Sequence, residues 1–356
     1  MRIALDGMGG DHAPEVNVAG AIQALRQDPE LEIVLVGRPE ALEQELAKAG
    51  APSRGITIHP ASQVAEMTDA PSAVLRRKRD ASIRVCFDLH KAGEVQAVVS
   101  AGNSGATMAV GMVVMGRLPE VDRPGLASVF PALSGPVVVI DVGANVDCTS
   151  LMLLQFGYMG AVYAERVLEI PNPTVGLLSI GEESGKGNSL VKQAYEYLSN
   201  SNLNFVGNVE GRDLFSGEVT VIVCDGFVGN VCLKLTEGLV AAYHQLVREE
   251  INRSNRGRLG ALMLKPSFAR LKKRMDYATY GGAPLLGING VAYICHGASS
   301  PRAIASALRM ATGSVKGKVT RHLAEGLDQY RGALLGEPGE PGGEAAAGEA
   351  GPAPAA

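Results

Sequence analysis

The chain has 356 residues, 46% of them hydrophobic, enough for two domains or one large α/β unit with a sizeable core. Its formal net charge of −4 argues against a general nucleic-acid-binding protein, which is normally basic. No apolar run reaches the roughly 18–20 residues that span a bilayer. The opening MRIALDG indicates a strand rather than a signal peptide, and the five cysteines form no C-x-x-C pair. We therefore expect reduced thiols in a cytoplasmic protein, not a disulfide framework or a zinc site.

Short apolar segments alternate with longer amphipathic ones over residues 1–335. Several of the short segments are apolar throughout, as strands covered on both faces should be. The clearest helix candidate is 228–251, in which apolar residues four apart form one stripe. This alternation predicts an α/β fold with a largely parallel sheet and helices on both faces. The strand candidates are 2–6, 32–36, 56–59, 96–100, 126–130, 136–141, 174–180, 204–207, 219–224 and 291–295, and the stripe is Val231, Leu235, Leu239, Tyr243, Val247 and Ile251.

The last segment, 336–356, contains only Gly, Pro, Ala and Glu. None of these residues fills a core well, so we expect a disordered acidic tail.

Six predicted strands lead into loops rich in Gly, Asn and Asp. One such loop is usually only a turn, because Gly and Asn tolerate positive φ. Six at equivalent strand ends favour a shared cleft, since ligands of open α/β sheets bind beyond the carboxyl ends of the strands. Backbone N–H groups, small hydroxyls, amides and Lys186 suit a small oxyanion there. The loops are GMGGDHAP (7–14), AGNSGATMA (101–109), VGANVDC (142–148), GEESGKGN (181–188), DGFVGN (225–230) and HGASS (296–300).

Nucleotide cofactors fit these loops poorly. A Walker A loop has four residues between its glycines and Ser or Thr after the lysine. Here three residues separate Gly181 from Gly185, and Gly187 follows Lys186. The G-x-G-x-x-G dinucleotide fingerprint is also missing after the first strand, where GMGGDH has another spacing.

A side-chain nucleophile has little support either, since no G-x-S-x-G elbow is present. Cys148 and Cys224 lie near the loops, with His12 and His296 as activating bases, but a cysteine ending an apolar strand is more often buried and inert. Glu182 and Glu183 are either bases or solvated turn residues. Asp225 either orients a ligand or caps the helix that follows it.

In this order, the loops resemble the bacterial phosphate acyltransferase family, the acyl-[acyl-carrier-protein]:phosphate acyltransferases of phospholipid synthesis. The resemblance covers nearly the whole chain before the tail, with slight departures at Gly7 and Ser104, where Ala and Thr are commoner. The matching stretches are ALDGMGGDHAP (4–14), SAGNSGATMA (100–109), GRLPEVDRP (116–124), DVGANVDC (141–148), LLSIGEESGKGN (177–188), GNVEGRDLFSGEVTVIVCDGFVGN (207–230) and YGGAPLLGINGVAYICHG (280–297).

The resemblance implies a Rossmann-like three-layer α/β/α fold akin to isocitrate and isopropylmalate dehydrogenases and phosphate acetyltransferase, as a homodimer. It implies transfer of a long-chain acyl group from acyl carrier protein to inorganic phosphate, without a cofactor. The acyl phosphate then passes to a membrane acyltransferase that makes phosphatidic acid. Phosphate is itself the nucleophile, so the enzyme need only hold it against the thioester and stabilise the oxyanion. We assign no metal.

On this interpretation Lys186 and the amides of 185–188 bind phosphate. Asn230 positions the reacting groups or donates to the oxyanion, unless it only caps a helix or sits in a turn. The wider set expected around the cleft is Asp6, Gly9, Gly10, Asp11, His12, Asn103, Ser104, Asn145, Gly185, Gly187, Asn188 and Asp225.

Residues 248–274 carry nine Lys or Arg around the apolar LGALML (259–264). This protruding segment is a helical hairpin packed on a neighbour or dimer mate, a docking surface for the acidic carrier protein, or a membrane-surface segment. The family is peripherally membrane-associated, which favours the third interpretation. The residues expected to enter the interface are Leu259, Leu262, Met263, Leu264 and Phe268.

Three other functions stay open. An NAD-dependent decarboxylating dehydrogenase of the isopropylmalate type shares the fold, but it needs clustered aspartates and an arginine set that the loops do not offer. An acetyl- or butyryl-CoA:phosphate acyltransferase uses the same chemistry with another carrier. A non-catalytic module that binds lipid surfaces or the carrier protein leaves the dense polar loops unexplained.

Overall fold

The computed structural model describes residues 1–50, 54–274 and 279–335, with the backbone alone for 272–274 and 329–335, so the predicted tail lies outside the described residues. All ten predicted strands form, and β10 is an additional one. The strands are β1 (Arg2–Asp6), β2 (Glu32–Gly37), β3 (Ile56–Pro60), β4 (Ala97–Ser100), β5 (Gly125–Pro131), β6 (Pro136–Ile140), β7 (Thr174–Leu178), β8 (Asn204–Val209), β9 (Val221–Val223), β10 (Ala283–Leu286) and β11 (Ala292–Ile294).

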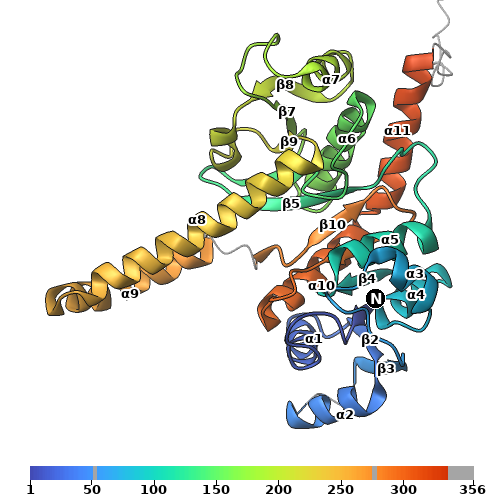
Figure 1. Ribbon diagram of the computed structural model, residues 1–356, viewed down its shortest axis with the longest axis vertical. Helices are drawn as coiled ribbons and strands as arrows, with labels where there is room; N and C mark the ends of the chain where they lie inside the picture. The colour runs from blue at the N-terminus through green and yellow to red at the C-terminus, as the bar shows by residue number, and fades with distance from the viewer. Residues whose placement is uncertain (51–53, 275–278, 336–356) are drawn as a thin grey trace, which may run out of the picture.

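The helices connect and flank these strands (Figure 1). They are α1 (Glu15–Gln27), α2 (Pro39–Lys48), α3 (Pro71–Arg77), α4 (Ser82–Lys91), α5 (Ser104–Met115), α6 (Ser150–Arg166), α7 (Ser189–Ser199), the 3-10 helix η1 (Gly211–Phe215), α8 (Gly226–Asn252), α9 (Asn255–Arg274), α10 (Pro301–Lys316) and α11 (Val319–Leu335).

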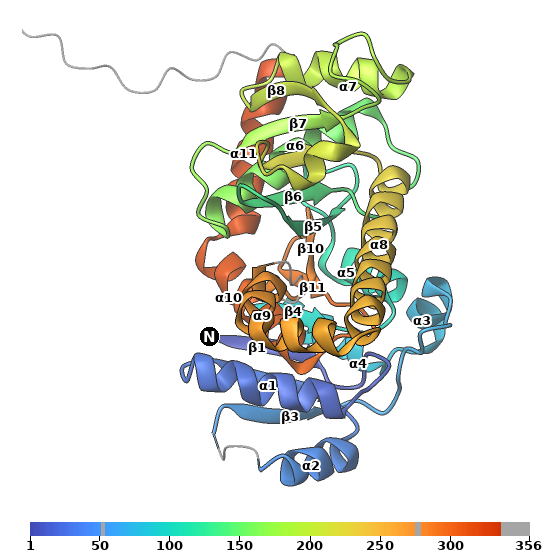
Figure 2. The same ribbon diagram turned by 90° about the vertical axis from the view of Figure 1, so that its left-hand side faces the viewer.

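The described strands join one 11-stranded sheet in the order β3-β2-β1-β4-β11-β10-β5-β6-β9-β7-β8. Figure 2 shows the central strands β4, β11, β10, β5 and β6 following one another through the molecule. Neighbours are parallel from β3 to β11 and again from β6 to β8. The three pairings β11–β10, β10–β5 and β5–β6 are antiparallel. The predicted largely parallel α/β sheet is confirmed, but its two halves run in opposite directions.

Alternating side chains of the strands supply two faces. In β1, Ile3 and Leu5 belong to the apolar core under α1, α10, α6 and α11, whereas Ala4 belongs to the core under α3, α4 and α5. In the other half of the sheet, Val139 and Ile222 pack with residues of η1 and the start of α8. Helices therefore cover both faces of the sheet, and the three apolar clusters are built mainly from aliphatic side chains.

The predicted helix 228–251 forms as α8, but only its start packs against the sheet, through Cys232 and Leu233. Gly226 and Gly229 are its only buried residues, and the part beyond Leu233 projects from the body together with α9 (Figure 1). The predicted apolar stripe is therefore largely exposed, with Leu235 70% and Leu239 66% accessible. We call α8 and α9 the projecting hairpin. No helix in the described part of the chain is long and apolar enough to cross a membrane.

Candidate active site

The glycine-rich loops lie in two groups of three, because the strand direction reverses in the centre of the sheet. The loops after β1, β4 and β11 leave one half of the sheet, and those after β6, β7 and β9 leave the other. The expectation of six equivalent strand ends is therefore wrong in its simple form. The groups meet through α5: Met108 packs in the same apolar cluster as Val142, Leu178 and Ile294, which lie at or just beyond the ends of strands from both halves.

Asn17 of α1 organises the loop after β1, although nothing in its sequence context marks it as a site residue. Its buried amide donates to the carbonyl oxygens of Asp6, Gly7 and Gly9 at 3.2, 3.2 and 2.8 Å. Because one side-chain amide donates to three carbonyls of the loop, it fixes a turn that the backbone hydrogen bonds of the loop do not close.

Asp6 is a scaffold residue and not a surface ligand. Its carboxylate is buried and accepts hydrogen bonds from the Ser100 hydroxyl at 2.8 Å and the Met8 N–H at 3.2 Å. Burial raises the pKa of Asp6 above its ordinary value, against the effect of these donors. Gly9 lies directly on this carboxylate, since a Cβ there would stand 2.6 Å from Asp6 Oδ2.

Gly10, Asp11 and His12 form the open part of the same loop. Gly10 has φ +109°, a conformation that favours glycine. The Asp11 N–H donates to the Gly297 carbonyl at 2.8 Å, which joins the loops after β1 and β11. The side chains of Asp11 and His12 are exposed and available to a ligand.

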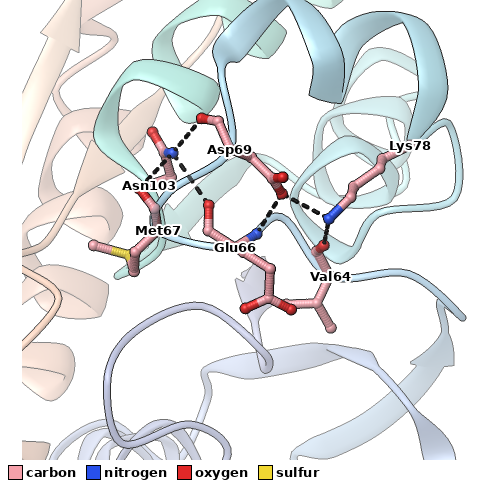
Figure 3. A network of polar contacts seen from close by, with 6 residues as sticks. All are labelled: Val64, Glu66, Met67, Asp69, Lys78 and Asn103. Carbon is pink, nitrogen blue, oxygen red and sulfur yellow. Dashed lines mark hydrogen bonds and ion pairs between the residues drawn. The ribbon is translucent and has the colours of Figure 1, made fainter.

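Asn103 uses its side chain internally (Figure 3). Its Oδ1 accepts the Ala106 N–H at 3.0 Å and so caps α5. Its Nδ2 donates to the carbonyls of Glu66, Met67 and Asp69 at 3.2, 3.0 and 2.9 Å. Asn103 therefore positions the loop, and the neighbouring exposed Ser104 is left as the side chain open to a ligand.

Asp141, directly after β6, holds the loop of 142–148. Its Oδ1 accepts the N–H groups of Leu126, Gly143 and Ala144 at 3.0, 3.2 and 3.0 Å. Its Oδ2 accepts the Asn145 N–H at 2.6 Å and Asn145 Nδ2 at 3.0 Å. Burial raises the pKa of Asp141, while the hydrogen bonds from Ala144, Leu126 and Asn145 act in the opposite sense.

Asn145 links this loop to α8. Its Nδ2 also donates to the Pro124 carbonyl at 2.8 Å, and its own carbonyl accepts the Gly226 N–H at 2.8 Å. The predicted ligand Asn145 thus serves mainly to hold the first turn of α8 in place.

Asp225 is the N-cap of α8, since its Oδ1 accepts the Val228 N–H at 2.9 Å. Of the two interpretations of Asp225, the structure supports helix capping. The cap position is then filled, so Asn230 is neither a cap nor a turn residue but lies exposed in the first turns of α8. It faces the loop after β6, because a Cβ on Gly143 would stand 3.6 Å from Asn230 Oδ1.

Lys186 lies in an exposed turn between β7 and α7. Its N–H donates to the Glu183 carbonyl at 2.9 Å, and Gly187 beside it has φ +100°. Asn188 caps α7 by accepting the Val191 N–H at 2.9 Å, so the side chain of this predicted ligand is also engaged. The Lys186 ammonium has no acidic partner within the described ranges.

Arg212 of η1 neutralises one of the two glutamates in this turn. Its guanidinium lies 2.8 Å from Glu182 and 3.1 Å from Glu210. Glu182 is therefore held by Arg212 and not by Lys186, whose ammonium is left available to an anion.

The cysteines near these loops are poor nucleophiles. Burial raises the pKa of the Cys148 thiol to about 11 and that of Cys224 well above its ordinary value. Such thiols stay protonated at neutral pH. Over the residues described, no group of three or more His, Cys, Asp or Glu is placed to hold a metal ion.

The sequence matches known families over nearly its whole length. The family model described as "Fatty acid synthesis protein" matches residues 1–322. A phosphate acyltransferase of Geobacter sulfurreducens is 52% identical over 328 residues, which is 92% of this chain and 94% of the relative. A phosphate acyltransferase of Heliobacterium modesticaldum is 52% identical over 318 residues, covering 89% and 94% of the two chains. The chain belongs to the phosphate acyltransferase family. It is accordingly an acyltransferase, as the family resemblance of its loops implies.

Solved structures place the phosphate acyltransferase fold among phosphotransacetylase-like folds. A phosphotransacetylase of Streptococcus pyogenes aligns with a TM-score of 0.61 at 18% identity, over 89% of this chain and 94% of that one. A 4-hydroxythreonine-4-phosphate dehydrogenase of Klebsiella pneumoniae aligns with a TM-score of 0.53 at 14% identity, over 91% and 98% of the two chains. At such identities the likeness concerns the fold alone.

Proposed function

We propose that this acyltransferase moves a long-chain fatty acyl group from acyl carrier protein to inorganic phosphate, giving the acyl phosphate used for phosphatidic acid synthesis. The observation that carries the proposal is Lys186, an exposed ammonium without an acidic partner in the described part of the chain, set between two glycines in front of α7. A helix N-terminus and a lysine together favour a small dianion. The names of the relatives give phosphate as the acceptor in those proteins.

The chemistry needs no enzyme nucleophile. One phosphate oxygen attacks the carbonyl carbon of the thioester and forms the new C–O bond. The C–S bond then breaks, and its electron pair leaves with the sulfur as a thiolate that takes up a proton from phosphate or water. The protein's part is to hold phosphate in line and to stabilise the oxyanion of the tetrahedral intermediate.

Each open side chain then has a role. Lys186 and the amides of 185–188 bind phosphate, and the Asn230 amide donates to the oxyanion or orients the thioester. Further contacts to substrate come from the loops after β1 and β4, through Asp11, His12 and Ser104. Asp6, Asn103, Asn145, Asn188 and Asp225 act through the backbone they fix, because their side chains are hydrogen-bonded internally.

Substitution of Lys186 by Ala tests the proposal. We expect the KM for phosphate to rise and kcat/KM to fall by roughly 100-fold, the size of one lost charged contact in a transition state. Lys192 is the matched control, since it is an exposed lysine of α7 outside the turn. Undiminished acyl phosphate formation by a folded Lys186→Ala protein, assayed with palmitoyl-carrier protein and phosphate, contradicts the role.

The acyl donor separates the remaining alternatives. An acetyl- or butyryl-CoA:phosphate acyltransferase turns over short CoA thioesters faster than long-chain acyl carrier protein, and a comparison of kcat/KM for the two donors decides. A non-catalytic module gives no turnover with either. The closer kinship with isocitrate and isopropylmalate dehydrogenases stays a prediction about the fold.

We infer further that the projecting hairpin mediates self-association and membrane contact in a cytoplasmic, peripherally bound homodimer. The exposed stripe of α8, with Leu235 and Leu239, is an apolar surface that a second copy would cover. On α9, Leu262 and Met263 are exposed, Met263 to 77%, among arginines and lysines, as in interfacial helices. Contact with the downstream membrane acyltransferase would follow from such a location.

Two sets of substitutions separate these roles. Leu262→Glu with Met263→Glu should release the protein from anionic vesicles, while Val113→Glu, at an equally exposed site on α5, should not. Leu235→Glu with Leu239→Glu should give a monomer by light scattering. Unchanged co-sedimentation, or a persistent dimer, would overturn the respective role.

A further inference from the structure

Three arginines at the end of α3 form an exposed positive surface outside the predicted site residues. We call Arg76, Arg77 and Arg79 the arginine cluster. All three side chains are exposed, and none has an ion-pair or hydrogen-bond partner among the residues described. The lysine between them differs: Lys78 points inward to Asp69 at 2.6 Å and to the Val64 carbonyl at 2.8 Å. One side chain of the run anchors the turn, and three face solvent.

The arginine cluster lies beside the loops of the candidate site. The chain leaves β3 at Pro60 and enters α4 at Ser82, so residues 61–81 begin at the carboxyl end of β3, on the same side of these parallel strands as the loops after β1 and β4. Figure 3 shows how this segment is fixed: Asp69 accepts from Lys78 through its carboxylate and from Asn103 through its carbonyl. The start of α3 also touches the loop after β4, since a Cβ on Gly105 would stand 3.1 Å from Pro71.

The chemistry of the cluster favours a protein carboxylate surface. The chain as a whole is acidic, with a net charge of −4, so this run of cations is a local exception. Guanidinium groups match carboxylates in geometry and stay charged at every physiological pH. A lipid surface needs apolar side chains as well; exposed large apolar residues line the projecting hairpin, whereas the cluster has only Met67 nearby in the segment before α3.

We propose that the arginine cluster is the docking surface for the acidic acyl carrier protein. This rests on the proposed function, in which that carrier delivers the thioester. Docking here sets the carrier against α3, next to the Asn103 loop, so that the thioester enters from the side of Ser104 and Met67. Positive charge at the entrance also speeds encounter with an acidic partner.

The projecting hairpin, the other basic surface, is less suited to this task. The helix α8 has 27 residues, which at 1.5 Å per residue extends about 40 Å from the loop after β9. From Asn230 to the last residue, Asn252, the helix rises about 33 Å, so a carrier docked on α9 near the far end of the hairpin would lie about that far from Asn230. The arginine cluster is tied to a site loop through one hydrogen-bonded residue, Asp69.

Charge reversal at the cluster tests the proposal. The variant is Arg76→Glu, Arg77→Glu and Arg79→Glu together, with Lys78 retained to keep the fold. The control is Arg26→Glu, Arg54→Glu and Lys91→Glu, an equal change in net charge at three exposed positions that precede strands β2, β3 and β4, at the opposite edge of the sheet.

The measurement is kcat/KM for palmitoyl-carrier protein and for palmitoyl-pantetheine, an uncharged donor, at low and physiological salt. We expect the cluster variant to lose about 10- to 100-fold with the carrier-bound donor at low salt and less at high salt, the range of electrostatic steering. Activity with palmitoyl-pantetheine should be unchanged, and the control variant should match the wild type with both donors.

Direct binding of labelled carrier protein to wild type and variants separates this inference from the proposed function. If only the cluster variant loses carrier binding, the docking surface is supported. This holds even if the wild type forms no acyl phosphate, a result that would refute the proposed reaction but not the docking surface. Three results would overturn the docking surface. They are equal carrier binding by the wild type and the cluster variant, an equal loss of binding in the control variant, and an equal loss of kcat/KM with both donors in the cluster variant. Loss of anionic vesicle binding without loss of carrier binding would assign the cluster to lipid instead.

Discussion

Replacement of Asp141 by Asn should uncouple the loop after β6 from α8. In the wild type the carboxylate accepts five hydrogen bonds, three at Oδ1 and two, from Asn145, at Oδ2. An asparagine keeps one acceptor oxygen for the first three donors and turns an amide NH₂ toward the other two. Two donors thus lose their acceptor, at about 1–3 kcal/mol each, offset in part because a buried charge is removed. We expect the free energy of unfolding to fall by about 2–4 kcal/mol.

Urea denaturation followed by far-ultraviolet circular dichroism measures this loss of stability. The assay of acyl phosphate formation measures its effect on activity. The Asn145 carbonyl accepts the Gly226 N–H at the start of α8. The kcat for acyl phosphate formation should therefore fall even at urea concentrations below the unfolding midpoint, where the protein is still folded. Asp147→Asn in the same loop is the control, since Asp147 is exposed and should lose less than about 0.5 kcal/mol. If Asp141→Asn is as stable and active as Asp147→Asn, the carboxylate does not organise the site.

Three further substitutions probe other parts of the fold. A Cβ on Gly229 would overlap the Asp141 carbonyl oxygen, so Gly229→Ala should lower the free energy of unfolding in urea by about 3 kcal/mol. The control is Gly238→Ala, in open space on the same helix, which should be neutral or stabilising by roughly 0.5–1 kcal/mol. Burial lowers the pKa of His90 below its ordinary 6.5, and its Nε2 accepts a hydrogen bond of 3.0 Å from the Val291 N–H. Folding therefore favours the neutral form, so stability should be complete above pH 6.5 and decline as the pH falls below it. A His90→Gln protein that shows the same decline would exclude this residue as the cause. Asn17→Ala leaves three buried carbonyls without their donor and should cost about 2–3 kcal/mol by the same method, and an unchanged unfolding midpoint would show that water replaces the amide.

The sheet was predictable from the sequence because its strands are apolar on both faces, a local property. The strand β10 was missed since it has four residues and contains Pro284, which weakens any strand signal. Strand direction was not predictable, because it depends on which strands pair and not on what they contain. The reversal at β10, β5 and β6 therefore separates loops that look equivalent along the chain.

The candidate site divides in a similar way. The residue types of the loops were informative, but the sequence does not say which way an amide or carboxylate points. Asn103 was therefore predicted as a ligand and Asp225 as either a ligand or a cap, whereas both cap helices. Lys186 and Asn230 keep their predicted roles as proposals, because nothing in the described residues occupies their side chains. Asn17 carried no signal, whereas the run Arg76 to Arg79 carried one that only its position beside the loops makes meaningful.

The length of α8 has a mechanical consequence. Its fifth residue is Asn230, and its last residues lie at the outer end of the projecting hairpin, with no proline between them. A continuous helix of this kind bends little, so a tilt of a few degrees imposed at the outer end also moves the turn that carries Asn230. In the proposed function, a surface that the hairpin rests on would therefore set the angle at which the Asn230 amide meets its substrate.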